Sequence, residues 1–182
     1  MLIVNNTRDL NIINALNNGF ITRYTPNTES KEKIKNAMRQ ETKSFLLTTF
    51  GICIVSIIVL IILILIHSFI LEKIGIVIIK YALFIIPGIG VLSPLYGIYD
   101  FFSKGKCIKN DTFDCFIGNI SNKEENSEYY FLKGLVNEKA EFLKNMKPQN
   151  QVQPNDKVVL IRIDGDNYLI DINQLNDASL IA

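Results

Sequence analysis

The sequence predicts an integral membrane α-helical hairpin of two transmembrane helices joined to a small, barrel-like, mainly β domain at the C-terminal end. Residues 45–66 are 22 consecutive positions without a charge, and a second apolar stretch follows after seven residues. Short strand-like runs then recur through the last eighty residues. A chain of 182 residues has room for one small domain and an anchor, and we divide it at 1–43, 44–99 and 100–182.

The N-terminal segment, residues 1–43, is polar with scattered apolar positions. Asn6 or Thr7 can cap a short helix that ends at Gly19, where a left-handed residue fits. This helix is expected to carry one apolar face, formed by Leu10, Ile13 and Leu16.

A second helix start follows Pro26, at Asn27 and Thr28. From there we expect one helix over residues 29–66, with its first four turns in the cytoplasm. Basic side chains precede the membrane span: Lys31, Lys33, Lys35, Arg39 and Lys43. They fit an ordinary positive flank, or a dedicated binding site for anionic lipid diluted by nearby glutamates.

The first span, residues 45–66, covers about 33 Å as a helix, which matches a hydrocarbon core of about 30 Å. It is rich in β-branched residues that favour strands in water. In lipid the backbone must satisfy its own hydrogen bonds, so the run is expected to be helical. Core helices of soluble proteins rarely contain so long an uncharged run.

The second span runs from about Ile74 to Tyr99 and contains one charge, Lys80, whose ammonium can extend to the headgroups. Prolines remove backbone donors and predict a bend. Small residues predict close packing on the first span, with a gating hinge as the unsupported alternative. The residues of the predicted kink are Pro87, Gly88, Gly90 and Pro94.

The basic residues predict the orientation of the hairpin. Lys104, Lys106 and Lys109 follow the second span, and five basic residues precede the first. The connecting turn offers only Lys73, with Lys80 nearby. Because positive flanks stay in the cytoplasm, we expect a multi-pass protein of the plasma or inner membrane with both termini in the cytoplasm.

Residues 100–182 are mildly acidic, with 10 basic and 13 acidic side chains. Asp164 and Gly165 form a hairpin signal between the last two predicted strands. The strand at 157–163 is apolar on both faces and is expected to be buried on both. The predicted strands are 113–120, 128–135, 157–163 and 167–172.

The stretch between the second and third of these strands has two readings. Asn137 can cap a short helix over residues 138–146, or residues 140–144 can form a strand. About five short strands with at most one helix resemble compact barrels or half-barrels of the OB and SH3-like kind. That resemblance concerns the fold and implies no function.

No catalytic or metal-binding set is evident in the sequence. His67 is the one histidine, and it lies in the turn between the spans, so neither a hydrolase triad nor a zinc site can be assembled in the β domain. Cys107 and Cys115 would face each other on a hairpin turning at residues 110–112. In the cytoplasm we expect them reduced, as small buried side chains, with a redox pair as the alternative.

These observations favour a non-enzymatic membrane-anchored binding or regulatory protein without cofactors. The hairpin tethers the β domain, which binds a protein or a small ligand. The aromatic run at Tyr129, Tyr130 and Phe131 lies in an acidic domain, so we expect core packing rather than nucleic-acid binding. The alternative is a membrane effector or pore-former whose kinked hairpins assemble into a homo-oligomer when the β domain senses a ligand.

Overall fold

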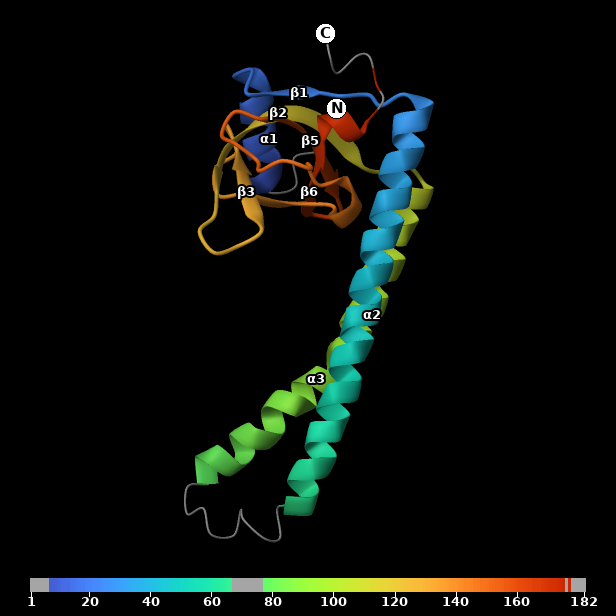
Figure 1. The fold of residues 1–182 in the computed structure, drawn as a ribbon, viewed down its shortest axis with the longest axis vertical. Coiled ribbons are helices and arrows are strands. Elements are labelled where there is room, and N and C mark those ends of the chain that lie inside the picture. The colour runs from blue at the N-terminus through green and yellow to red at the C-terminus, as the bar shows by residue number, and fades with distance from the viewer. Residues whose placement is uncertain (1–6, 67–76, 176, 178–182) are drawn as a thin grey trace. The chain divides into compact units, whose positions relative to one another are not determined.

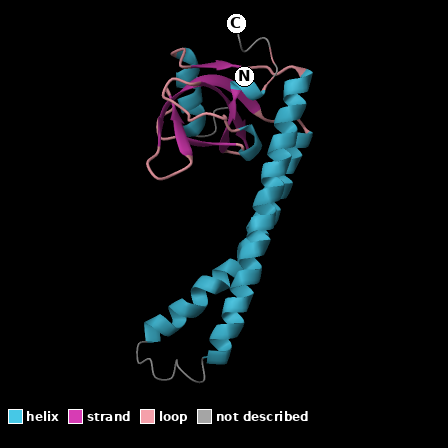
Figure 2. Cartoon of the chain, viewed as in Figure 1, coloured by secondary structure: helices cyan, strands magenta, loops and turns pink. Residues whose placement is uncertain are grey.

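The computed structural model describes residues 7–66, 77–175 and 177. Within these residues, three α-helices and six strands follow one another (Figure 1), with cyan helices and magenta strands in Figure 2. The helices are α1 (Thr7–Asn17), α2 (Thr28–Ile66) and α3 (Val77–Lys109). The strands are β1 (Ile21–Arg23), β2 (Asp114–Lys123), β3 (Tyr129–Leu132), β4 (Lys139–Phe142), β5 (Lys157–Ile163) and β6 (Asp166–Asp171), with 3-10 turns η2 (Lys144–Met146) and η3 (Ile172–Gln174).

The chain forms two units, and both long helices contribute to each. The barrel unit comprises the described parts of 1–41 and 106–182, and the hairpin unit is Thr42–Gly105. A pair of long apolar helices and a small closed barrel are therefore present, which confirms the predicted fold class.

Five strands close the barrel in the order β2-β3-β4-β6-β5 and back to β2. All neighbours are antiparallel except β4 and β6, which are parallel. The long strand β2 pairs with β5 from Asp114 to Asn119 and with β3 from Ile120 to Lys123, with a register shift between Ile120 and Asn122. Such a bulge bends a strand, so a single strand closes the barrel on both sides.

Alternate residues of the strands feed two separate cores. Phe116, Leu160 and Leu169 lie in register on the inner face and pack with Leu132 and Phe142 from the strands opposite. Ile161 and Val159 belong to the outer face of the same strands and are equally buried. The prediction that β5 is buried on both faces is confirmed.

The N-terminal residues complete both cores. Ile12 and Ala15 of α1 pack on the inner core, together with Ile21 of β1. Ile34 and Met38, in the first turns of α2, are 0% and 2% exposed and cover the outer face. Burying each such side chain stabilises the fold by about 1.5–3 kcal/mol. Sequence analysis does not anticipate that these residues belong to the folding unit of the barrel.

Several local predictions are confirmed. The side chain of Asn27 accepts a hydrogen bond from the Ser30 N–H at 2.8 Å, which caps α2 at the predicted place. Gly19 after α1 has φ 70°. Asp164 and Gly165 have φ 49° and 87°, as the turn of a two-residue hairpin requires.

Other local predictions are wrong. Residues 139–142 form a strand, so the helix proposed over 138–146 is replaced by β4 and the short η2 turn. β4 completes the ring of strands, and this non-local pairing outweighs the local preference for a helix. The buried face of α1 is formed by Ile12 and Ala15, whereas Leu10 is 48% exposed. Cys107 lies in α3 rather than on a hairpin with Cys115, because the helix continues to Lys109.

Candidate functional site

The two helices of the hairpin unit meet through small and polar side chains. In the hairpin part of α2, all but one of the buried or half-buried positions, Ser44 being the exception, recur at alternating steps of four and three residues, which is the spacing of a helix seam. They are Thr42, Leu46, Thr49, Cys53, Ser56, Leu60 and Leu63.

Glycines of α3 lie directly against this seam. A Cβ atom added at Gly90 would be 2.0 Å from the Ser56 Oγ, and one added at Gly97 would be 2.1 Å from the Thr49 Oγ1. Between them, the Ser93 hydroxyl lies 2.9 Å from the Thr49 carbonyl oxygen and 2.7 Å from that of Gly90. Small residues thus bring the two backbones close together, as in membrane helix pairs.

Apart from the seam leucines, most bulky apolar side chains of α2 and α3 point away from the seam. Ile54, Ile58 and Leu65 on α2 are 60%, 52% and 70% exposed. Ile86, Leu92 and Leu95 on α3 are 73%, 61% and 66% exposed. The described part of the chain contains two helices that are long and apolar enough to cross a membrane, with 6% and 17% of their apolar windows buried.

The residues of the predicted kink have different surroundings. Pro87 is buried, Pro94 is half-buried, and Gly90 is on the seam, whereas a Cβ at Gly88 would meet no atom within 4 Å. Figure 1 shows the green N-terminal part of α3 diverging from α2, and the later part running beside it. That the prolines and glycines cause this change of direction stays a prediction.

Most of the basic flank ahead of the first span is engaged within the barrel unit. Lys31 and Lys35 of α2 bind the Asp111 carboxylate at 2.8 and 2.5 Å. These two lysines hold the pKa of Asp111 below its ordinary value. Lys33 pairs with Glu29 at 3.0 Å on the same helix.

The remaining flanking residues divide into paired and exposed ones. Lys104 is 6% exposed and binds Asp100, one turn earlier in α3, at 2.9 Å. The Arg39 guanidinium lies 3.5 Å from the Asn36 side-chain oxygen. Lys43 and Lys106 are exposed. Lys73 and His67 lie outside the described residues, as does the side chain of Lys80.

A polar cleft of about 670 Å³ opens on the barrel. One wall is the segment 148–153, and the other is the start of β5 with the η3 turn. Phe142, 5% exposed, lies among the lining residues. Six of the lining residues carry side-chain amides: Gln149, Asn150, Gln151, Gln153, Asn173 and Gln174. These amides offer paired donors and acceptors, next to the charged side chains of Asp156, Lys157 and Asp171.

Buried polar groups tie the termini to the barrel. The Tyr24 hydroxyl donates to the Asp177 carboxylate at 2.7 Å, and burial raises the pKa of Tyr24. Glu138, 5% exposed, accepts from the amides of Asn11 and Asn167 at 3.3 and 3.1 Å. These contacts join segments far apart in the sequence and serve structure.

The cysteines are free thiols. Cys115 is buried in the outer core, with Cys107 packed against it at partial exposure. Burial raises the pKa of the Cys115 thiol to about 12, so it is unreactive at neutral pH. Cys53 lies on the helix seam, its thiol 3.5 Å from the Val91 carbonyl oxygen.

The aromatic run of β3 is only partly buried, since Tyr129 is 41% exposed. Tyr130 packs edge-on against Phe142, with ring centroids 5.1 Å apart. Within the described ranges, no three His, Cys, Asp or Glu side chains gather to hold a metal ion. Sequence reasoning missed the amide-lined cleft, whose one local signal is the run of amides at 149–153.

Comparison with protein-family models, with curated proteins and with solved structures finds no match to this chain.

Proposed function

We propose that the protein is a non-enzymatic, membrane-anchored binding protein whose hairpin spans the bilayer and whose barrel binds a ligand in the cytoplasm. The observation that carries the proposal is the reversed placement of side chains in the hairpin. Thr49 and Ser56 are 5% and 9% exposed, whereas the isoleucines beside them face outward.

This placement suits lipid and not water. In water, a long helix pair is held together by burial of its large apolar side chains. Here most of those side chains, including nearly all the isoleucines, are outside, and the closest contacts are made by glycines and hydroxyls. In a bilayer, an outward-facing isoleucine carries no free-energy cost of exposure, because lipid tails are as apolar as the side chain.

The basic residues support a cytoplasmic barrel. Eight lysines and arginines lie on the barrel side of the two helices, against Lys73 and Lys80 toward the turn. Ion pairing of Lys31 and Lys35 with Asp111 does not weaken this argument, since the rule counts basic residues rather than net charge.

The cleft supports the binding role. Its volume lies within the range of about 300–1,000 Å³ that is typical of ligand sites. Amide side chains form paired hydrogen bonds with polar groups, so the ligand is expected to be rich in hydroxyl or amide groups rather than apolar. Its class is a small polar molecule or an extended peptide segment of a partner protein.

Thiol labelling tests the topology. In a variant lacking Cys53, Cys107 and Cys115, a single cysteine replaces the exposed Glu125 of the barrel or His67 of the turn. We expect a membrane-impermeant maleimide to label the cysteine at position 67 in intact cells, and the cysteine at 125 only after permeabilisation. The reverse pattern would contradict the proposal.

Site-specific crosslinking tests the cleft. A photoreactive residue at Gln151 or Asn173, both exposed in the cleft lining, is expected to capture one ligand in membranes. The matched control replaces the exposed Asn126, which lies outside the cleft. Equal capture at all three positions would contradict a binding site.

The effector alternative has a test of its own. If expression of the protein arrests growth and Pro87→Ala abolishes the arrest, the effector alternative is favoured instead.

A further inference from the structure

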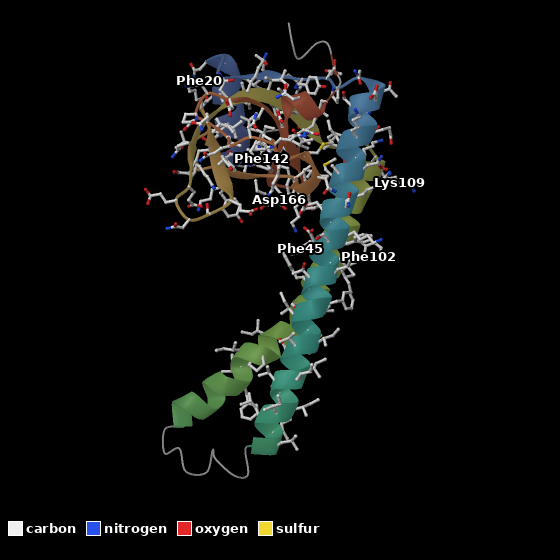
Figure 3. All side chains as sticks on the ribbon, in the orientation of Figure 1. Phe20, Phe45, Phe102, Lys109, Phe142 and Asp166 are labelled. Carbon is white, nitrogen blue, oxygen red and sulfur yellow. The ribbon has the colours of Figure 1, made fainter. Side chains whose placement is uncertain are left out.

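Aromatic side chains gather at one end of the hairpin unit. Phe45 on α2 and Tyr96 on α3 pack edge to face, with ring centroids 5.9 Å apart. Tyr99 and Phe102 follow on the next turns of α3 and are 70% and 69% exposed. In Figure 3, Phe45 and Phe102 lie at the same height on the helix pair. We call Phe45, Tyr96, Tyr99 and Phe102 the aromatic girdle.

The first charges of the hairpin lie at the same level as the girdle. Leaving the apolar part of α2, the chain reaches Lys43 two residues beyond Phe45. Leaving that of α3, it reaches Asp100 next to Tyr99, and Asp100 pairs with Lys104. The described stretches 44–66 and 84–99 contain no charged residue. The aromatic girdle and the first charged residues therefore mark the end of the apolar zone at the same level.

Resting on the proposed membrane-spanning hairpin, we propose that the girdle is a lipid-headgroup binding surface that fixes the depth of the protein in the bilayer. Aromatic rings with a polar atom favour the boundary between acyl chains and headgroups. The Tyr96 and Tyr99 hydroxyls can donate to phosphate or ester oxygens there. The edge of the hydrocarbon then lies at the level of the packed rings of Phe45 and Tyr96.

The helix lengths agree with this position. From Phe45 to the end of α2 at Ile66 is about 33 Å, and from Tyr96 back to the start of α3 at Val77 is about 30 Å. Both match a hydrocarbon thickness of about 30 Å. Tyr96 to Phe102 covers about 9 Å, which is comparable with one headgroup layer.

The position also accounts for the buried ion pair of α3. Asp100 and Lys104, with side chains 12% and 8% exposed, would be costly in hydrocarbon. At the girdle they lie in the headgroup layer, where they neutralise one another. Lys106 and Lys109 then lie beyond the bilayer surface.

Tryptophan fluorescence tests this depth, because the chain contains no tryptophan. The full chain, with one tryptophan at Tyr99, Phe102, Ile58 or Val136, is reconstituted in phosphatidylcholine vesicles. Ile58 lies in the middle of the first span and is 52% exposed, and Val136 is on the barrel and 64% exposed. Quenchers are bromines deep in the acyl chains, a nitroxide on the headgroup, and aqueous acrylamide.

We expect Ile58→Trp to be quenched mainly by the deep bromines, Val136→Trp by acrylamide, and both girdle variants mainly by the headgroup nitroxide. If the girdle variants show the quenching pattern of Val136→Trp or of Ile58→Trp, the proposed depth of the girdle is wrong, while the spanning hairpin is not contradicted. If Ile58→Trp escapes the bromines, the spanning hairpin itself fails. Since all four positions are exposed, the substitutions are not expected to unfold the chain, and the far-UV circular dichroism of each checks this.

Discussion

The barrel and the hairpin place the same residue types on opposite sides. In the barrel, Leu160 and Leu169 are fully buried, and polar side chains face outward. In the hairpin, Ile57 and Ile58 are 43% and 52% exposed, while Thr49 is buried. The difference teaches that apolar content alone does not identify a core. The direction in which the apolar side chains point indicates the solvent, which under the proposed function is water around the barrel and lipid around the hairpin.

One helix contains both arrangements. The first turns of α2 bury Ile34 and Met38 within the barrel unit. Its later turns, in the hairpin unit, expose Ile54 and Val55. The following substitutions break or sharpen this comparison.

The largest effect is expected from Leu160→Asp in the inner core. An unpaired carboxylate in this fully buried position costs several kcal/mol, comparable with the whole stability of a small domain. We expect the barrel to lose its cooperative thermal transition by near-UV circular dichroism, while the chain still inserts into membranes. A barrel that melts like the parent would contradict the assigned core.

Ile34→Ala tests whether the start of α2 belongs to the barrel. Truncation of this fully buried side chain is expected to destabilise the barrel by about 2–5 kcal/mol in urea. Ile57→Ala, on the outward face of the hairpin, serves as the control and should leave the barrel transition unchanged. Equal effects of the two would show that α2 does not cover the barrel.

Ile58→Asp places the same charge as Leu160→Asp on an exposed position of the hairpin. The position is 52% exposed and loses little packing, yet an aspartate at the centre of a span costs about 2.5–3.5 kcal/mol on insertion. We expect the carbonate-resistant fraction in membranes to fall. Val136→Asp, at a similarly exposed barrel position, should not change it. If both variants insert fully, the outward face of the hairpin does not meet lipid.

Gly90→Val tests the seam between the helices. A side chain there overlaps Ser56, and such overpacking typically costs about 1–3 kcal/mol. Spin labels at Leu47 and Ile98 are expected to report a longer or broader distance distribution. Gly88→Val is the matched control, because a Cβ at Gly88 meets no atom within 4 Å. If both variants give the same distance distribution, the assignment of Gly90 to the seam is wrong.

The smallest effect concerns Asp111 and its two lysines. Because its pKa is lowered in the folded chain, its contribution is present above the ordinary value of 3.8 and is lost as the pH falls through the lowered pKa. Asp111→Asn should therefore be slightly less stable than the parent at pH 7, with the difference vanishing in acid. Glu125→Gln is the exposed control. A difference that persists at pH 2 would contradict the ion-pair account.

The elements with strong local or compositional signals could be predicted from the sequence. The uncharged run at 45–66 predicts its helix, Asn27 its cap, and Asp164 with Gly165 the hairpin turn. Of the two readings of the stretch between β3 and β5, the helix over 138–146 is wrong and the strand over 140–144 is confirmed in part, because pairing with β3 and β6 fixes β4 at Lys139–Phe142.

Features that depend on contacts between distant parts of the chain were harder to predict from the sequence. The burial of Ile12 and Ile34 depends on strands more than 80 residues later in the chain. The cleft is formed by the segment 148–153, the start of β5 and the segment 171–174, which the barrel brings together. Lys104 reads as a flanking charge in the sequence, whereas in the structure it is buried against Asp100.

The most direct test of the reversed hairpin is a spin-label scan along residues 43–66 of the full chain in vesicles. The account predicts that labels at Ile54, Ile58 and Leu65 are accessible to oxygen, which is concentrated in lipid, and not to an aqueous nickel complex. Labels at Thr49 and Ser56 should be shielded from both. Nickel access to the isoleucine positions would show that they face water and would contradict the central claim.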